Sequence, residues 1–108
     1  MDESQMLKGI LEGCILAVIY KGETYGYEIL AILEEKGLLD INEGTLYPIL
    51  KRLEKKGLII YRIGESPYGP KRKYFSITKP GEEFLLQWKK AYRELMVAAN
   101  LIIWGDGE

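Results

Sequence analysis

Apolar residues recur at helical spacing from the start of the chain. Between residues 4 and 21 they follow one another at intervals of three and four, and Ser4 stands where a helix-capping side chain is expected. Beyond Gly13 this segment is apolar almost all round. A helix of that kind is buried on more than one side, and in a chain of this length the pattern indicates cover by another subunit.

A second helix is predicted between Thr24, a candidate N-cap, and Gly37, a candidate residue for the turn that ends it. Its inner face is formed by Ile29, Leu30, Ile32 and Leu33. Gly26, near its start, lowers helix propensity. Two explanations stand open for this glycine: close packing of the backbone within the chain, or close approach to a partner.

A third helix is indicated by an apolar stripe at positions i, i+3, i+4 and i+7, made of Leu46, Ile49, Leu50 and Leu53. Pro48 lacks a backbone N–H and therefore belongs near the first turn of a helix. This favours a regular helix from about Thr45, after a lead-in turn at 42–44. Alternatively, Asn42 caps the helix and Pro48 bends it. Gly57 is expected to end the helix.

A β-hairpin and a long helix complete the chain. The β-rich runs 58–63 and 72–77 flank the segment GESPYGPK, which reads as a hairpin loop. A last helix is predicted from Thr78 to about Trp104, with Pro80 in its first turn and a length of ~39 Å. Three helices followed by a hairpin predict a winged helix-turn-helix, a mainly α fold with a small β-hairpin (α+β). We expect a winged-helix domain at 1–78 and a dimerisation helix at 79–108, in one compact unit.

Six residues of the last helix form a seam with the spacing of a coiled coil: Leu85, Trp88, Tyr92, Leu95, Ala99 and Ile102. A helix of ~39 Å outreaches the core of so short a chain, so we expect it to pack against a second copy. The alternative is packing on the first helix of the same chain. Ile10, Cys14 and Val18 of the first helix, which is also apolar all round, are expected to complete this interface.

The composition argues against catalysis and metal binding. The chain has 108 residues, of which 47% are hydrophobic, so a single domain with a real core is expected. It contains no histidine and one cysteine, Cys14, which leaves no general base of the commonest kind and no zinc site. No phosphate-binding glycine loop and no nucleophile elbow are present. We therefore expect no enzyme activity, no cofactor and no metal.

The chain is expected to work in the cytoplasm and away from membranes. A single thiol forms no internal disulfide, and nothing resembles a secretory signal. The longest uncharged apolar stretches, Gly13–Tyr20 and Leu95–Gly105, fall short of the ~20 residues that a membrane span needs. Cys14 is expected to be a small buried hydrophobe, with a redox-sensing thiol as the alternative.

Charge is distributed unevenly along the chain. The net charge is −1, yet residues 45–79 hold nine cations and two anions, which leaves −8 for the remainder. Such asymmetry indicates a basic surface that faces a polyanion. The alternative is an ordinary solvated face.

Three segments resemble the PadR family of bacterial transcriptional regulators: YGYEI at Tyr25–Ile29, GTLYPILKRLEKKGLI at Gly44–Ile59 and KRKYFSITKPG at Lys71–Gly81. The resemblance spans residues 5–104 and is to the small subfamily with one C-terminal helix. It implies a homodimeric winged-helix repressor whose first and last helices form the dimer interface and whose third helix enters the major groove. The chain departs from the family where wings often read Gly-Gly-Arg, since it has Pro70 and Lys71, and in its short ending WGDGE.

Double-stranded DNA is the expected partner, and ten residues are candidates to contact it: Tyr25, Tyr27, Thr45, Tyr47, Lys51, Arg52, Lys55, Lys71, Arg72 and Lys73. Thr45 and Tyr47 lie at the start of the recognition helix, where side chains reach base edges. The cations would position the protein on phosphates. Two alternatives remain open: Arg52 pairs with an acidic residue inside the domain, and one of Tyr25 and Tyr27 belongs to the core.

The resemblance also implies an effector site, because some small PadR proteins bind flat aromatic compounds at the dimer centre. The candidate residues here are Leu11, Ile15, Trp88 and Tyr92. Two copies related by a dyad would gather four aromatic rings, which either line a pocket or fill the interface. Trp104 is expected to anchor against the partner's first helix. The alternative to a DNA-binding repressor is a winged-helix module that binds an acidic protein surface.

Overall fold

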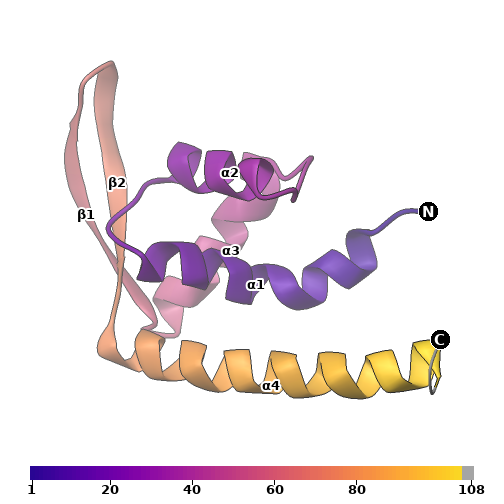
Figure 1. Cartoon of the computed structure of the whole chain (residues 1–108). Helices are drawn as coiled ribbons and strands as arrows, with labels where there is room; N and C mark the ends of the chain where they lie inside the picture. The colour runs from indigo at the N-terminus through magenta and orange to yellow at the C-terminus, as the bar shows by residue number, and fades with distance from the viewer. Residues whose placement is uncertain (106–108) are drawn as a thin grey trace.

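The predicted order of elements is confirmed in a computed structural model that describes residues 1–105 of the chain. Three helices, a two-stranded antiparallel hairpin and a long helix follow one another (Figure 1): α1 Ser4–Tyr20, α2 Gly26–Glu35, α3 Glu43–Lys55, β1 Ile59–Ser66, β2 Gly69–Ile77 and α4 Lys79–Trp104. This is the winged-helix fold. The hairpin is the wing, and it projects past the ends of α2 and α3 (Figure 1).

Two of the expected helix caps are wrong, and both differences have a local cause. Ser4 already lies inside α1, where its backbone N–H donates to the Asp2 carboxylate at 2.9 Å. Thr24 is drawn one residue away from α2 because its backbone pairs with Phe75 of the hairpin, through N···O distances of 3.1 and 2.7 Å. Its hydroxyl donates instead to Glu28, at 2.6 Å.

The start of α3 has the Asn42 cap of the second alternative considered above. The Asn42 side chain accepts a hydrogen bond from the backbone N–H of Thr45 at 3.1 Å, so α3 begins at Glu43 and Pro48 lies inside it. Gly37 and Gly57, with φ of 106° and 76°, end α2 and α3 as predicted. The capped start places Thr45 and Tyr47 in the first two turns.

The hairpin is longer than the sequence indicated. The expected eight-residue loop is mostly strand, and only Pro67 and Tyr68 form the turn between Ser66 and Gly69. Pro70 is tolerated because each strand of a two-stranded sheet has one edge without ladder partners. A register irregularity between Gly64 and Ser66 lies just before the tip.

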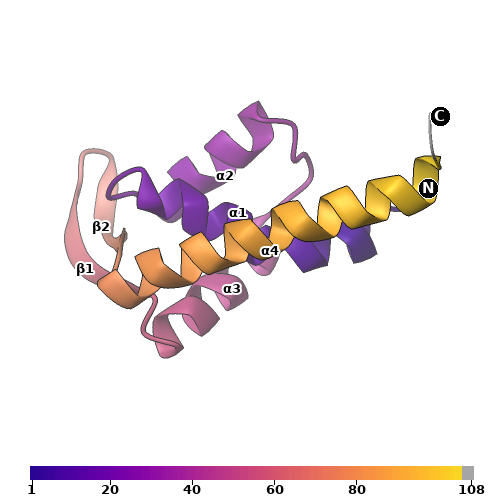
Figure 2. The same ribbon diagram turned by 60° about the horizontal axis from the view of Figure 1, so that its bottom comes forward.

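The core lies between the first three helices and the base of the hairpin. It consists of Leu11, Ile15, Leu16, Ile19, Ile29, Leu33, Leu46, Ile49, Leu50, Leu53, Leu58, Ile59, Phe75 and Leu85. The predicted stripe of α3 is thus fully buried. Leu85 is the one residue of α4 in this set, because α4 runs along the outside of α1 (Figures 1 and 2).

The C-terminal half of α4 extends beyond that core. It reaches the end of the molecule where the N-terminus also lies (Figure 2), and the longest extent of the chain is 54 Å. Within residues 1–105, no helix combines the length and the apolar character that crossing a bilayer requires.

Candidate nucleic-acid interface

The start of α3 is packed against the start of α2 through one tyrosine. A Cβ atom added to Gly26 would lie 2.3 Å from the Tyr47 hydroxyl oxygen, so the absence of a side chain at Gly26 makes room for this ring. Of the two explanations for Gly26, close packing within the chain is the one that the structure has. Tyr47 remains 43% exposed, and its ring is oriented by α2 while its surface faces solvent.

Tyr27 adds a second link between the same two helices. It is 68% exposed, and the nearby Glu43 carboxylate in the first turn of α3 raises the pKa of its hydroxyl. Tyr27 is therefore no core residue and stays protonated at neutral pH. Glu43 belongs to the same first turn of α3 as Thr45, at the end of the helix that was expected to read bases.

A surface hollow of about 600 Å³ separates the starts of α2 and α3 from the wing. Six of the predicted DNA-binding residues lie around it: Tyr25, Tyr27, Tyr47, Lys71, Arg72 and Lys73. A second hollow of about 330 Å³ continues between α3 and the wing, with Lys51 and Tyr47 on its border. The helix end and the wing thus face a common space with tyrosine hydroxyls and ammonium groups around it.

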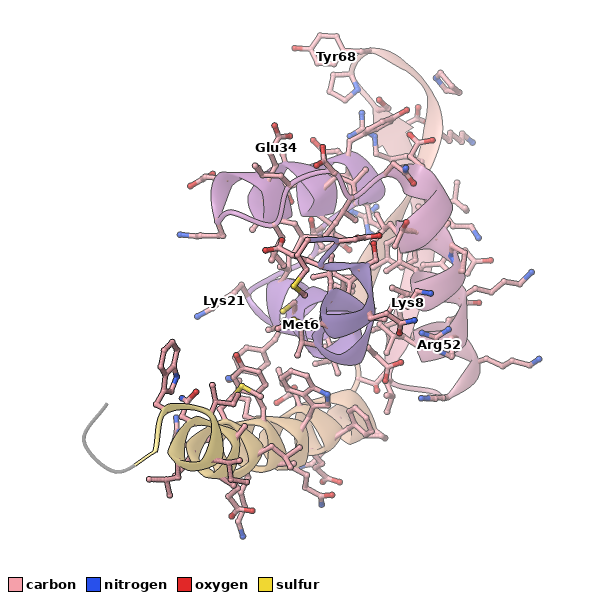
Figure 3. All side chains as sticks on the ribbon, turned by 90° about the vertical axis from the view of Figure 1, so that its right-hand side faces the viewer. Met6, Lys8, Lys21, Glu34, Arg52 and Tyr68 are labelled. Carbon is pink, nitrogen blue, oxygen red and sulfur yellow. The ribbon has the colours of Figure 1, made fainter. Side chains whose placement is uncertain are left out.

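The cations of α3 divide into two groups. Lys51 and Lys55 are exposed. Arg52 points back toward α1 (Figure 3), where its Nε donates to Glu12 Oε2 at 3.2 Å, and Lys56 Nζ donates to Glu12 Oε1 at 3.4 Å. The alternative for Arg52, pairing inside the domain, is thus the arrangement that the structure has.

The wing cations are similarly divided. The Arg72 guanidinium carbon lies 4.0 Å from the centroid of the Tyr25 ring, and Arg72 also donates to the Ser66 hydroxyl across the hairpin. Lys73 Nζ lies 4.2 Å from the Tyr61 ring centroid. Lys71 is exposed near the tip.

Several residues of this region were not among the candidates predicted from the sequence. Tyr68, at the tip of the wing, is 94% exposed and lies far from α4 (Figure 3). Arg62 and Glu23 form a salt bridge beside Tyr74. The alternation of β1 and β2 was a usable signal, because it places Arg62 opposite Tyr74 in the ladder.

The residues expected at a dimer interface also divide. Leu11, Ile15 and Leu85 are at most 2% exposed and belong to the protomer's own core, which corrects their assignment to an interface or an effector pocket. Ile10, Cys14, Val18, Trp88 and Ala99 are half-buried, whereas Tyr92, Leu95 and Ile102 are exposed. At the start of α4 the seam therefore packs into the core of the protomer through Leu85. Toward the end of α4 the seam residues are exposed to solvent.

Trp88 and Tyr92 form a parallel stack, with centroids 5.2 Å apart and planes 11° apart. A Cβ on Gly13 would meet the Trp88 indole at 2.3 Å, so the ring lies directly on the α1 backbone. Cys14 follows Gly13 on α1, and burial raises the pKa of its thiol, which disfavours the thiolate that a redox sensor needs. Within residues 1–105, no cluster of potential ligands suited to a metal ion occurs.

Comparison with known proteins gives the family. The model of the transcriptional regulator PadR-like family matches residues 15–87. The chain belongs to the PadR-like family. Its members are transcriptional regulators and not enzymes, which agrees with the expectation from composition.

Two of the similar proteins match along nearly the whole chain, and a third matches about three quarters of it. The chain is 42% identical to a PadR-like transcriptional regulator from Bacillus cereus, with a TM-score of 0.83 over 94% of this chain and 99% of the other. An uncharacterised protein of Lysinibacillus sphaericus is 35% identical over 97% of this chain and 98% of its own length. PadR of Bacillus subtilis, solved in complex with operator DNA, is 28% identical with a TM-score of 0.66, over 73% of this chain and 46% of the other.

Proposed function

We propose that the chain binds operator DNA as a homodimer and represses transcription, and that a flat aromatic effector releases it. The observation that carries the DNA-binding part is the common space between the start of α3 and the wing, with Tyr47, Lys51 and Lys71 around it. Thr45 and Tyr47 would meet base edges, while the lysines would meet phosphates. Such a regulator would act in the bacterial cytoplasm, where the DNA is.

Support for repression comes from a relative. PadR of Bacillus subtilis is a negative transcriptional regulator, and it is 28% identical to this chain over 73% of this chain and 44% of its own length. A repressor of this kind would occupy a promoter in its DNA-bound form. A symmetric dimer would bind two half-sites related by a two-fold axis.

Support for a homodimer comes from the apolar end of α4. Between Leu95 and Trp104 the one polar residue is Asn100, and most of these side chains are exposed in the protomer. A large exposed apolar surface on a small domain marks an interaction site. A hollow of about 320 Å³ near the start of α1 is bordered by Met6, Ile10 and Leu39, with Glu3 and Asp40 at its edge, and in a second copy it would receive apolar side chains of α4.

Lysines of α3 test the DNA-binding proposal. We expect Lys51→Ala and Lys55→Ala each to weaken operator binding and to make the dependence of log K on log salt shallower. The slope falls by about 0.9 for each phosphate that a lysine no longer neutralises, or about 1.8 per substituted lysine in a symmetric dimer. Fluorescence anisotropy of a labelled duplex, titrated at several salt concentrations, measures both effects.

The matched controls for this experiment lie in the same chain. Lys90→Ala removes an exposed charge of α4 and should leave affinity and slope unchanged. Arg52→Ala should leave the slope unchanged as well, because the Arg52 guanidinium is held by Glu12. Unchanged slopes for both Lys51→Ala and Lys55→Ala would contradict the proposed interface and favour an acidic protein partner.

Support for the effector comes from the stacked Trp88 and Tyr92. A second copy across a dyad would bring four rings together, and flat apolar ligands bind between such rings. We expect a planar tricyclic dye to quench tryptophan fluorescence of the wild-type protein and to release labelled operator.

Two variants serve as controls. Trp88→Leu should lose both responses while it still binds DNA. Tyr20 is an exposed aromatic residue elsewhere on the protomer, so Tyr20→Leu should keep both responses. Absence of quenching up to the solubility limit would mean that the rings fill the interface.

A further inference from the structure

The outer face of the wing is tied to the segment that leads into α2. Arg62 of β1 donates two hydrogen bonds to the two carboxylate oxygens of Glu23, from Nε at 2.8 Å and from Nη2 at 2.7 Å. Two parallel bonds of this kind fix the orientation of both groups. Because Glu23 lies between α1 and α2, this pair joins the hairpin to the helical part of the domain.

From the Arg62–Glu23 pair, a row of contacts continues through three further side chains. The Arg62 guanidinium carbon lies 4.6 Å from the centroid of the Tyr74 ring. Tyr74 meets Tyr25 edge to face, with centroids 5.7 Å apart and planes at 72°, and Arg72 covers Tyr25 at 4.0 Å. An unbroken row of contacts therefore runs from Glu23 to Arg72.

Backbone bonds anchor the lower end of this row. Thr24 and Phe75 exchange two main-chain hydrogen bonds beside Glu23. Above them, the Tyr74 hydroxyl donates to the Glu65 carbonyl at 2.8 Å, close to the tip. An isolated two-stranded hairpin is marginally stable in water, so these side-chain contacts add to the strand pairing in the upper part of this one.

We propose that Arg62 is a wing-positioning residue: it holds the hairpin at the angle at which Lys71 reaches the DNA backbone, and it does not itself contact phosphate. This proposal rests on the DNA-binding function proposed above. A wing that is ordered before binding loses less conformational entropy when DNA binds. The Arg62 charge is already met by Glu23, so it has little to contribute to counterion release.

Two variants separate positioning from phosphate contact. Arg62→Met keeps a side chain of similar length and removes the charge. We expect operator affinity to fall by about 10-fold with the salt slope unchanged, because an ordering cost is added while every phosphate contact remains. Lys71→Met is the matched comparison, and its slope should become shallower by about 1.8 in a symmetric dimer.

Glu23→Gln gives results of opposite sign for the two roles. If Arg62 positions the wing, this variant weakens binding to a similar degree, and Glu23→Gln combined with Arg62→Met weakens it no further, since both remove one interaction. If Arg62 is a phosphate contact, loss of Glu23 frees its charge and tightens binding. Tighter binding by Glu23→Gln, or a shallower slope for Arg62→Met, would overturn the proposal.

A measurement on the protein without DNA tests the positioning role of Arg62 independently of the proposed DNA-binding function. Amide hydrogen exchange of the wing should be faster in Arg62→Met than in the wild type, and unchanged in Lys71→Met. Equal exchange in all three proteins would overturn the positioning role even if DNA binding is confirmed. Faster exchange in Arg62→Met, combined with a wild-type protein that binds no duplex, would support the tie and refute the DNA-binding proposal alone.

Discussion

Replacing Leu95 and Ile102 together by glutamate is expected to yield a folded monomer that binds operator DNA at least about 100-fold more weakly than the wild type. Both side chains are largely exposed in the protomer, at 65% and 83%, so the substitutions leave the winged-helix core untouched. In the proposed dimer each copy would bury two unpaired carboxylates in an apolar interface, which is strongly unfavourable.

The size of the effect follows from linkage of two half-sites. When two binding units are joined, the second unit binds its half-site at a high effective concentration. The gain in affinity is typically about 10²–10⁴-fold, and a monomer loses a gain of that size. Light scattering after size-exclusion chromatography gives the mass, and anisotropy gives the affinity. Far-UV circular dichroism checks that the monomer is folded.

Gln87→Glu is the matched control for this experiment. It introduces the same carboxylate on α4, at an exposed position outside the apolar end, and should leave both mass and affinity unchanged. A double variant that stays dimeric at micromolar concentration would show that the apolar end of α4 is not the interface. The copies would then have to meet elsewhere.

Gly81→Ala is expected to destabilise the protein by about 3 kcal/mol, near the upper end of what overpacking costs. An added Cβ would lie 2.1 Å from the backbone oxygen of Leu58 and 2.7 Å from Cγ1 of Ile77. Backbone cannot move aside as a flexible side-chain end does. The α4 helix would have to separate from the base of the hairpin, where Leu58 precedes β1 and Ile77 ends β2.

The same junction is closed by hydrogen bonds. Thr78 caps α4 by accepting from the Gly81 N–H at 3.1 Å, and its hydroxyl donates to the Gly57 carbonyl at 2.7 Å. Its backbone N–H also donates to the Leu58 oxygen, at 3.0 Å. A shift of α4 strains all three bonds, so the loss of stability extends beyond the single clash.

Gly9→Ala is the control, and its expected effect on stability has the opposite sign. No atom lies within 4 Å of the position of its added Cβ, and Gly9 is inside α1. Alanine there should stabilise the helix by about 0.5–1 kcal/mol. Urea unfolding at one fixed protein concentration measures both variants, since stability of an oligomer depends on concentration. Equal stability of Gly81→Ala and the wild type would contradict the tight junction between α4 and the base of the hairpin.

Local patterns were sufficient to predict the elements and their order. The stripe of α3, from Leu46 to Leu53, is buried because its spacing matches the helical period. The seam of α4 was less informative. Leu85 and Leu95 belong to the same heptad pattern, yet Leu85 is 2% exposed and Leu95 is 65% exposed. Periodicity shows which face of a helix is apolar, but not how far the protomer's own core extends along it.

Contacts between elements that are far apart along the chain could not be predicted from the sequence. Arg52 lies 40 positions from Glu12, and Arg62 lies 39 positions from Glu23. Whether such a cation meets a carboxylate or solvent depends on the angle between two packed elements, and no local pattern determines that angle. Arg52 and Arg72 were candidates for DNA contact because of their charge, and in the structure Arg52 pairs with Glu12 while Arg72 lies over the Tyr25 ring.

Sequence-specific DNA binding is tested most directly by fluorescence anisotropy of the full chain with duplexes recovered from a random library, against a scrambled duplex of equal length and at two salt concentrations. We expect recovery of a two-fold symmetric site that the chain binds with a Kd of about 10⁻⁸ M or tighter. This site should be preferred over the scrambled duplex by about 10³-fold or more, and salt should weaken its binding. Failure of the library to yield a preferred sequence, with equal and weak binding to both duplexes, would contradict the claim that this chain is a sequence-specific regulator.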